Sequence, residues 1–341
     1  MKILLTNGRL ARRGGTELYL KDVALGLQKR GHMPFVYSPT LGEIAKELRS
    51  AVIPVVDDLK KLSVVPDVIH GQHHMETMTA LLHFGGVPAV YVCHGWIPWE
   101  EGAPRFPRIL RYIAVDHACR ERLLFEHGIP EDRIKVLFNF VDLERFKPRE
   151  PLPSRPKRAL IFSNYASKNG YVPIVREACS QAGLTLDIVG EQINNSSSEP
   201  EKILGQYDLV FAKGRAAIEA VAVGTAVILC DMGKVGPMVT AAELDTLRPV
   251  NFGIRARQEP INKAALLREI GRYNAEDAAL ASKRLRASAG HNDVIDELVS
   301  IYEEVIGENN TRGAQDPALE ARAAAEYLRE LSPRLKEYEA L

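Results

Sequence analysis

Two loops in the first half of the chain carry residue types that could bind an anion or move a proton. The first holds the pair Gly14-Gly15 beside Arg9, Arg12 and Arg13, just before a stretch with helical periodicity. Paired glycines let backbone N–H groups approach a ligand, and a helix N-terminus favours negative charge there. Many ordinary turns also contain a glycine pair, so an anion site and a plain turn both remain open.

The second loop begins with His94, directly after the apolar run 89–93. A histidine at the carboxyl end of a strand can bind a sugar hydroxyl or assist proton transfer, although backbone partners could equally satisfy it. His70, His73 and His74 lie close together in the sequence. No pattern of carboxylates completes a metal site around them, so no metal is expected.

Two further loops in the second half carry charged residues. Lys168 follows the apolar run 159–163 and could act as a point charge for a phosphate, or be an ordinary solvated lysine. Glu219 stands among alanines and valines, where a carboxylate is costly unless it is paired or bound to a ligand. It could accept hydrogen bonds from both hydroxyls of a ribose. The structural alternative is an ion pair with Arg215, which follows Gly214 and lies four residues before Glu219 on the same helical face.

Parallel sheets covered by helices are the elements expected to position these loops. Short apolar runs alternate with amphipathic segments, as in α/β proteins, and helical periodicity over 16–30 is stopped by Gly31. The predicted strands are 2–6, 33–37, 52–55, 67–70, 89–93, 112–115, 135–138, 159–163, 185–189, 209–212 and 226–230. Ligands of such sheets bind at the carboxyl ends of the strands.

Proline content predicts where the chain divides. Four prolines within 147–156 indicate a semi-rigid linker. We therefore expect two Rossmann-like, doubly wound parallel-sheet lobes, 1–150 and 151–306, facing a cleft, followed by a C-terminal helical tail over 307–341.

The expected tail contains a polar loop over 307–313 and a helix over 318–331, which Pro333 ends. The apolar residues expected to pack this helix on the surface are Leu319, Ala323, Tyr327 and Leu331. A role as an interaction tail is the alternative.

Composition excludes several classes of function. The 341 residues include 44 basic and 44 acidic side chains, with 46% hydrophobic and 26% charged residues, which argues against long disorder and against nucleic-acid binding. The four cysteines are far apart and form no CxxC motif, so neither a zinc site nor a disulfide framework is expected. The sequence shows neither a signal peptide nor an apolar run of about 18 residues, so we expect a cytoplasmic protein.

Six segments, taken in chain order, form a fairly specific set. They are 14–17, 27–32, 66–70, 129–136, 139–142 with Phe146, and 219–227. This ordered set resembles the GT-B-fold glycosyltransferases of family 4. The resemblance runs from residue 1 to 230 and more loosely to 305.

The resemblance implies transfer of a sugar, of hexosyl type, from a nucleotide-sugar donor to an acceptor, with retention at the anomeric carbon. The acceptor, on the first lobe, could be a saccharide, a lipid-linked glycan or a small molecule, and the donor would lie on the second lobe. Neither metal nor cofactor is implied, because cationic side chains and helix N-termini neutralise the leaving diphosphate in this fold.

Site residues follow from the same resemblance. His94 matches the catalytic histidine beside the transferred sugar, Glu219 the ribose-binding carboxylate, and Lys168 the diphosphate-binding lysine. The expected donor-binding residues are Gly14, Gly15, Lys168, Gly190, Gly214, Arg215 and Glu219.

Two positions depart from the family pattern. The stretch 163–165 lacks the usual arginine, and Phe211 stands where a second glutamate precedes Glu219 by eight positions. We hypothesise that Arg215 or Lys213 supplies the missing positive charge. A non-catalytic nucleotide-binding or interaction protein of the same fold, and a sugar-nucleotide epimerase, are the alternative functions.

Peripheral contact with a membrane is a further possibility. Arginines alternate with apolar residues over 104–125, a pattern that could lie on anionic lipid if the acceptor were a lipid. A solvated basic face around the predicted strand 112–115 is the alternative.

Overall fold

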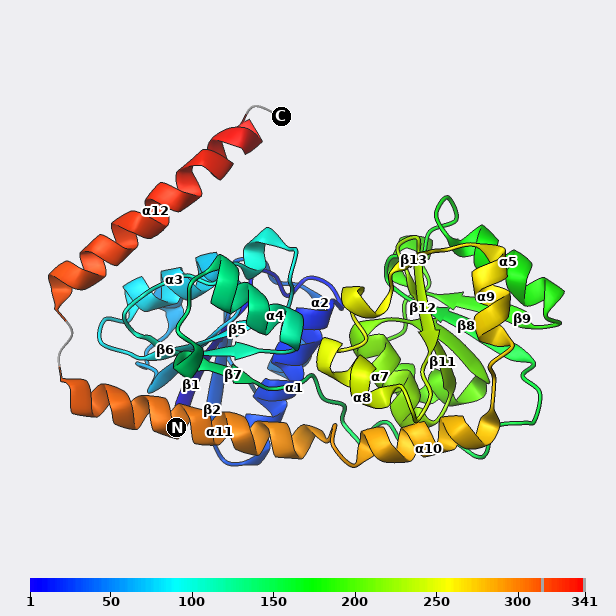
Figure 1. Cartoon of the computed structure of the whole chain (residues 1–341). Helices are drawn as coiled ribbons and strands as arrows, with labels where there is room; N and C mark the ends of the chain where they lie inside the picture. Colours follow the sequence, from blue (N-terminus) through cyan, green and yellow to red (C-terminus); the bar gives the residue numbers. More distant parts are fainter. Residues whose placement is uncertain (314–315, 340–341) are drawn as a thin grey trace. The chain divides into compact units, whose positions relative to one another are not determined.

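The computed structural model describes residues 1–313 and 316–339. The chain folds into two compact units, which we describe separately (Figure 1). Unit 1 comprises Met1–Leu137 and Asp293–Leu341, and unit 2 comprises Phe138–Asn292. Each unit contains a sheet covered by helices, which confirms the predicted α/β class.

Unit 1 contains a parallel sheet of seven strands in the order β3-β2-β1-β4-β5-β6-β7. The strands are β1 (Lys2–Thr6), β2 (Met33–Tyr37), β3 (Val55–Val56), β4 (Val68–Gly71), β5 (Ala89–Cys93), β6 (Ile109–Ala114) and β7 (Ile134–Val136). The strand order reverses between β1 and β4. Ligands of open α/β sheets bind at the carboxyl ends of the strands at such a reversal, so the loops after β1 and β4 are the place to look for a site.

Helices cover this sheet and confirm the predicted helix after β1, whose residues Leu20, Val23 and Leu27 are fully buried. The helices of unit 1 are α1 (Gly15–Lys29), α2 (Glu43–Ser50), α3 (His74–His83), α4 (His117–Glu121), α11 (His291–Arg312, beginning at the unit boundary) and α12 (Pro317–Glu339). Shorter turns are η1 (Leu59–Lys61), η2 (Trp99–Glu101), η3 (Arg122–Glu126) and η4 (Glu131–Arg133).

Unit 2 contains a sheet of six strands in the order β13-β12-β11-β10-β8-β9. The strands are β8 (Arg158–Phe162), β9 (Thr185–Val189), β10 (Leu209–Ala212), β11 (Ala226–Asp231), β12 (Lys234–Met238) and β13 (Glu259–Pro260). The first four are parallel as predicted, whereas β12 and β13 add an antiparallel edge that the sequence pattern did not indicate. The strand order reverses between β8 and β10, so ligands are expected at the loops that follow these two strands.

Two apolar cores lie on the two faces of this sheet. Alternation along β10 places Val210 and Ala212 in the core with α7 and α10, and Leu209 and Phe211 in the core with α5 and α9. The helices of unit 2 are α5 (Val172–Gln181), α6 (Pro200–Ile203), α7 (Gly214–Val223), α8 (Leu244–Leu247), α9 (Lys263–Ile270) and α10 (Ala275–Arg286). Shorter turns are η5 (Glu191–Ile193), η6 (Leu204–Gln206), η7 (Arg248–Val250) and η8 (Ile254–Ala256).

The proline-rich segment 147–156 is not a linker between the units, because it lies within unit 2. The Arg149 N–H donates to the Val223 carbonyl at 2.8 Å, and the Tyr273 hydroxyl donates to the Pro153 carbonyl at 2.8 Å. Prolines lose a backbone donor but keep their carbonyl, so such a segment can still be fixed to its neighbours. The first compact boundary therefore falls after Leu137, earlier than the expected residue 150.

The expected boundary after residue 306 and the polar loop over 307–313 are also wrong. Helix α11 continues to Arg312, and its residues from Asp293 onward belong to unit 1. Glu308 in this stretch is an ion-pair partner, since Arg111 Nη1 lies 2.7 Å from its Oε2. Pro333 does not end the last helix, because α12 continues past it to Glu339.

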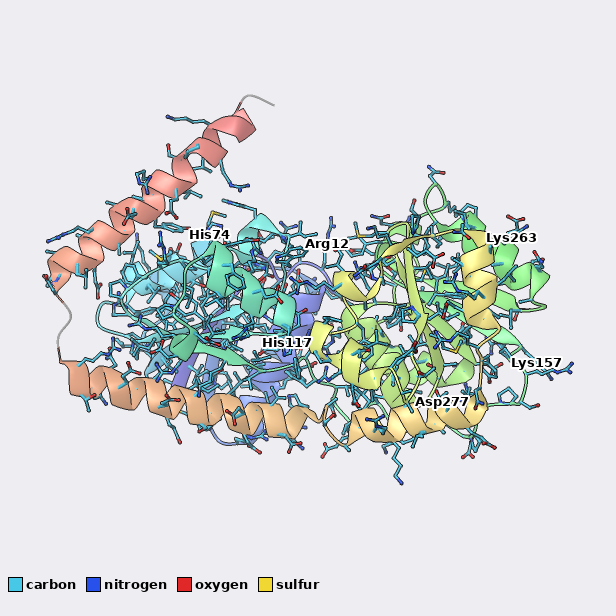
Figure 2. The ribbon with its side chains drawn as sticks, in the orientation of Figure 1. Arg12, His74, His117, Lys157, Lys263 and Asp277 are labelled. Carbon is cyan, nitrogen blue, oxygen red and sulfur yellow. The ribbon has the colours of Figure 1, made fainter. Side chains whose placement is uncertain are left out.

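Polar contacts fix α12 to unit 1. Arg108, whose side chain is 1% exposed, pairs with Glu320 at 2.7 Å (Nε to Oε1) and 3.1 Å (Nη2 to Oε2). His74 Nδ1 lies 2.8 Å from the Tyr327 hydroxyl (Figure 2). Leu319 is 48% exposed, so the expected apolar packing fails at that residue. The tail is thus an integral element of unit 1.

Candidate functional site

Glu219 is buried on α7, the helix that starts directly after β10 at the strand reversal of unit 2. Arg215 lies one turn earlier on the same face, and its Nε donates to Glu219 Oε1 at 2.8 Å. The structural alternative weighed from the sequence, an ion pair, is therefore present. The pairing also orients the carboxylate in an otherwise apolar helix, where its oxygens can accept hydrogen bonds from a ligand.

Glycine is needed at two positions of unit 2, Gly214 and Gly190, for different structural reasons. Gly214 opens α7 with φ +51°, a conformation that residues with a Cβ rarely adopt. A Cβ on Gly190 would lie 1.9 Å from the Ser163 carbonyl oxygen, so this glycine lets the loop after β9 pack against the loop after β8. Gly190 thus shapes the scaffold of the site.

Asp231 forms a buried polar network at the end of β11. Its Oδ1 accepts hydrogen bonds from the Ser163 hydroxyl at 2.8 Å and the Tyr171 hydroxyl at 3.0 Å, and its Oδ2 lies 2.7 Å from Lys213 Nζ. The Lys213 ammonium also lies 4.4 Å from the centroid of the Tyr165 ring. The network places a lysine at the carboxyl ends of β10 and β11. Sequence reasoning missed Asp231, although an acid that closes an apolar strand was a visible signal.

Lys168 lies in the segment between β8 and α5. It is exposed and lines a hollow of about 770 Å³ together with Arg176, Ile188 and Ile193. Neither Glu219 nor Arg215 is among the lining residues of this hollow. The structure therefore brings Arg215, Glu219 and Gly214 together on one helix and gives Lys168 different neighbours.

The glycine loop of unit 1 holds an acid as well as arginines. Gly14 caps α1, Gly15 is its first residue, and a Cβ on Gly14 would lie 2.3 Å from Glu17 Oε2. Burial raises the pKa of Glu17. Of the three arginines, Arg13 pairs with Glu43 at 3.1 Å and with Glu47 on α2. The start of α1 is thus less cationic than its sequence indicates.

Arg9 and Arg12 are the exposed arginines of this loop, and Arg12 is labelled in Figure 2. Their exposure leaves surface positive charge near the carboxyl end of β1.

His73 and Glu101 form a pair that sequence reasoning did not select. His73 follows β4 with φ 59°, and its Nδ1 accepts a hydrogen bond from the Gly8 N–H at 2.9 Å. The proton of the neutral ring therefore lies on Nε2, which is 3.5 Å from Glu101 Oε1. Burial would raise the pKa of Glu101, but the bond from His73 and nearby positive charge hold it below its ordinary value.

His94 lies at the end of β5, where sequence reasoning expected it. Its backbone N–H donates to Glu101 Oε2 at 2.9 Å, and its ring meets the Tyr19 ring edge-on with centroids 4.5 Å apart. Burial lowers the pKa of His94 to about 4, so the imidazole is neutral near pH 7. Within the described part of the chain its Nε2 has no hydrogen-bond partner. That atom is suited to bind a hydroxyl.

The neighbouring histidines have structural partners. His70 Nδ1 lies 2.6 Å from the hydroxyl of Tyr302 on α11, and His74 contacts Tyr327 on α12. Among residues 1–313 and 316–339, no group of three or more histidines, cysteines or acids is arranged to hold a metal ion.

The arginines of 104–125 serve mainly internal contacts. Arg108 pairs with α12, Arg111 pairs with Glu308 on α11, and Arg122 Nη1 donates to the Gly95 carbonyl at 2.6 Å. No helix within the described ranges has both the length and the hydropathy needed to cross a bilayer.

Comparison with known proteins supports the interpretation of this architecture. Residues 13–145 match the family model Glycosyltransferase Family 4. A glycosyltransferase from Rickettsia africae ESF-5 is 19% identical, with a TM-score of 0.66 over 89% of this chain and 98% of that one. Anabaena Alr3699/HepE in complex with UDP and glucose is 18% identical, with a TM-score of 0.64 over 89% and 100% of the chains.

Sucrose-phosphate synthase from Thermosynechococcus elongatus is 14% identical, with a TM-score of 0.62 over 90% of this chain and 99% of that one. The chain has the GT-B fold of the glycosyltransferases. The family-model match confirms the resemblance to family 4 over its part of the chain. No curated protein matches the sequence.

One departure from the GT-B family pattern now has a structural cause. Phe211 is fully buried in β10, in the core beside Ile161 and Ile228. Alternation along the strand turns this position toward α5 and α9, so a carboxylate there would be buried among apolar side chains. The acid at this end of the sheet is instead Asp231, on the neighbouring strand.

Proposed function

We propose that this chain is a glycosyltransferase that moves a sugar from a nucleotide-sugar donor to an acceptor. The observation that carries the proposal is the buried Glu219 carboxylate on α7, oriented by Arg215 at 2.8 Å, beside the strand reversal of unit 2. A carboxylate fixed in this way can accept hydrogen bonds from both hydroxyls of a ribose. Because the carboxylate is buried, water replaces the hydrogen bonds of such a ligand poorly.

The comparisons support a nucleotide-sugar as donor. The HepE structure that shares this fold holds UDP and glucose, and a second structure of the same protein holds UDP-glucose. The family-model match, over residues 13–145, lies mostly in unit 1 and does not include α7, so it adds independent support. Retention at the anomeric carbon and transfer of a hexosyl group are part of our proposal.

Charges at the start of α7 suit the leaving diphosphate. The first-turn N–H groups of a helix have no intrahelical acceptor and favour an anion. Lys213 precedes the helix as its capping residue, and Arg215 lies in its first turn. Fixed positive charge of this kind stabilises a departing diphosphate, so the proposed reaction uses no metal ion.

In unit 1 we assign His94 to binding beside the sugar that is transferred. A neutral imidazole can accept a hydrogen bond from a hydroxyl or donate one to it, depending on its tautomer. Glu101 fixes the backbone of His94 and also contacts His73, so one acid positions both histidines. The acceptor class remains a saccharide, a lipid-linked glycan or a small molecule.

A non-catalytic nucleotide-binding protein is the second candidate. The observation that favours it is Phe211, which removes a carboxylate expected beside the transferred sugar. Such a protein would bind a nucleoside diphosphate through Glu219 and release no product.

Product formation distinguishes these functions. The purified chain is incubated with UDP-, GDP-, ADP- and TDP-sugars, each with sugar, lipid-linked and small-molecule acceptors, and products are identified by mass spectrometry. A glycosylated product supports the transferase, and the anomeric proton coupling in its NMR spectrum tests retention. Nucleotide binding without any product, in the presence or absence of EDTA, would support the non-catalytic alternative. Isomerisation of the donor without acceptor would identify an epimerase.

A further inference from the structure

Arg248 is a buried cation that no acid among the described residues balances. It opens η7 and is 8% exposed. One nitrogen, Nη2, donates to the Asn139 carbonyl, and the guanidinium lies 5.3 Å from the centroid of the Phe138 ring. The other terminal nitrogen, Nη1, is buried and has no hydrogen-bond partner in the described residues. No carboxylate of the described chain pairs with it.

An unbalanced guanidinium of this kind is costly. Moving a cation out of water carries a large desolvation penalty that a counter-charge normally offsets. Burial lowers the pKa of Arg248 to about 10, with no neighbouring acid to oppose the effect. By contrast, the buried guanidinium of Arg108 faces the Glu320 carboxylate. The absence of an acidic partner for Arg248 among the described residues points to an anion from outside the chain.

Backbone hydrogen bonds tie η7 to the start of α7. The Phe252 N–H donates to the Leu247 carbonyl at 3.0 Å, which closes the segment around Arg248. The Phe252 carbonyl then accepts a hydrogen bond from the Gly214 N–H, also at 3.0 Å. Gly214 is the first residue of α7, so Arg248 belongs to the segment that abuts the helix end where an anion is favoured.

A second polar atom in the same segment also lacks a partner. Asn251 is 6% exposed, and its Oδ1 has no hydrogen-bond partner among the described residues. Buried polar atoms are nearly always satisfied in folded proteins, so two exceptions three residues apart are informative. One is a donor and the other an acceptor, which matches a ligand that carries both phosphate oxygens and hydroxyls.

We propose that Arg248 binds the diphosphate of the nucleotide donor, together with the start of α7. This inference rests on the proposed function and adds a cation that the sequence comparison with family 4 did not indicate. It also offers a replacement for the arginine missing from 163–165, in addition to the charges of Arg215 and Lys213 at the start of α7.

Arg286 provides the matched control. Its Nη1 donates to the Phe146 carbonyl at 2.7 Å and the Ala222 carbonyl at 3.0 Å, and its Nη2 donates to the Leu143 carbonyl at 3.3 Å. Both arginines therefore fix the chain segment that opens unit 2. Arg286 does so at the far end of α7 with its terminal nitrogens occupied. A purely structural role at Arg248 would make the two substitutions equivalent.

The experiment compares wild type, Arg248→Gln, Arg248→Lys and Arg286→Gln by calorimetry. Each is titrated with the nucleoside diphosphate that wild type binds best and with the corresponding nucleoside. We expect Arg248→Gln to weaken diphosphate binding about 10- to 100-fold, as for loss of a hydrogen bond to a charged group, with nucleoside affinity unchanged. Arg248→Lys should give a smaller loss, and Arg286→Gln should leave the ratio of the two affinities at its wild-type value.

Equal weakening of nucleoside and diphosphate by Arg248→Gln, or no weakening of either, would overturn the inference. If Arg248→Gln does not fold, Arg248→Lys decides, and an unchanged affinity ratio in that variant overturns it as well. Thermal stabilisation by inorganic pyrophosphate separates this inference from the proposed function. We expect pyrophosphate to stabilise wild type and Arg286→Gln but not the Arg248 variants, even if no nucleotide binds. Equal stabilisation of all variants would overturn it.

Discussion

Glu101 Oε2 accepts a hydrogen bond from the His94 backbone N–H at 2.9 Å, and Oε1 of the same carboxylate lies 3.5 Å from His73 Nε2. One buried acid in η2 therefore links the ends of β4 and β5. Because His73 also accepts a hydrogen bond from the Gly8 N–H, the linkage extends to the loop after β1. These three strand ends meet where ligands of such a sheet bind.

Replacing Glu101 by glutamine should destabilise unit 1 and slow any transfer reaction. The amide can accept the bond from His94 but carries no charge for His73, so we expect the free energy of unfolding to fall by about 1–3 kcal/mol. Glu100→Gln is the matched control, because Glu100 is exposed. This substitution should change the free energy of unfolding by less than about 0.5 kcal/mol. Urea unfolding measures both, and equal effects would contradict the role of Glu101.

His94 should make the protein less stable as the pH falls. Its pKa is about 4 in the folded chain and near 6.5 when unfolded, so the unfolded chain binds more protons between these values. Stability therefore declines as the pH drops from about 6.5 toward 4. The difference in unfolding free energy between wild type and His94→Gln should rise with pH across this window and level off above it. A flat difference would show that the imidazole titrates normally.

The last helix should contribute measurably to the stability of unit 1. Glu320→Gln leaves the 1%-exposed Arg108 guanidinium without its counter-charge, which should cost about 3 kcal/mol or more. Glu330→Gln is the control on the same helix, because Glu330 is 55% exposed and lies 3.5 Å from an exposed arginine. That pair should contribute less than about 1 kcal/mol. Similar losses for both variants in chemical unfolding would show that α12 is only loosely attached.

Arg215 and Lys168 test which cation acts in donor binding. Arg215→Ala removes the partner of Glu219 at 2.8 Å and should weaken donor affinity about tenfold, by the usual value of a charge-assisted hydrogen bond. Lys168→Ala should have a smaller effect, because Lys168 lines the hollow on the flank of α5. Unchanged affinity in Arg215→Ala would exclude its role at the donor. A larger effect of Lys168→Ala would restore the assignment made from the family resemblance.

Much of the fold could be predicted because parallel strands buried on both faces are continuous apolar runs. The strands β1, β2, β5, β9 and β10 match their predicted bounds. The antiparallel strand β12 was missed because Lys234–Met238 contains a glycine and a proline and pairs with β11 after a tight turn. The boundaries between the units were missed because they depend on α11, which belongs mostly to unit 1. No local sequence pattern indicates that the chain returns to unit 1 there.

The candidate site was only partly predictable. Glu219 and His94 were visible because a charged or titratable residue interrupted an apolar pattern. Asp231, Glu101 and Arg248 act through partners distant in the chain, such as Lys213 and Asn139, and those pairings arise only from the fold. Sequence spacing also indicated an anion site at Gly14-Gly15, whereas the structure places the Glu17 carboxylate against that turn.

The central claim is that Glu219 holds the ribose of a nucleotide donor. Calorimetric titration with UDP, GDP, ADP and TDP, comparing wild type, Glu219→Ala and the exposed control Glu177→Ala, tests it most directly. We predict that one ribonucleotide binds wild type and Glu177→Ala equally and Glu219→Ala at least about tenfold more weakly. Its 2′-deoxy analogue should bind wild type more weakly than the ribonucleotide does. In Glu219→Ala the two nucleotides should bind equally. No binding by wild type, or equal binding by all three proteins, would contradict the claim.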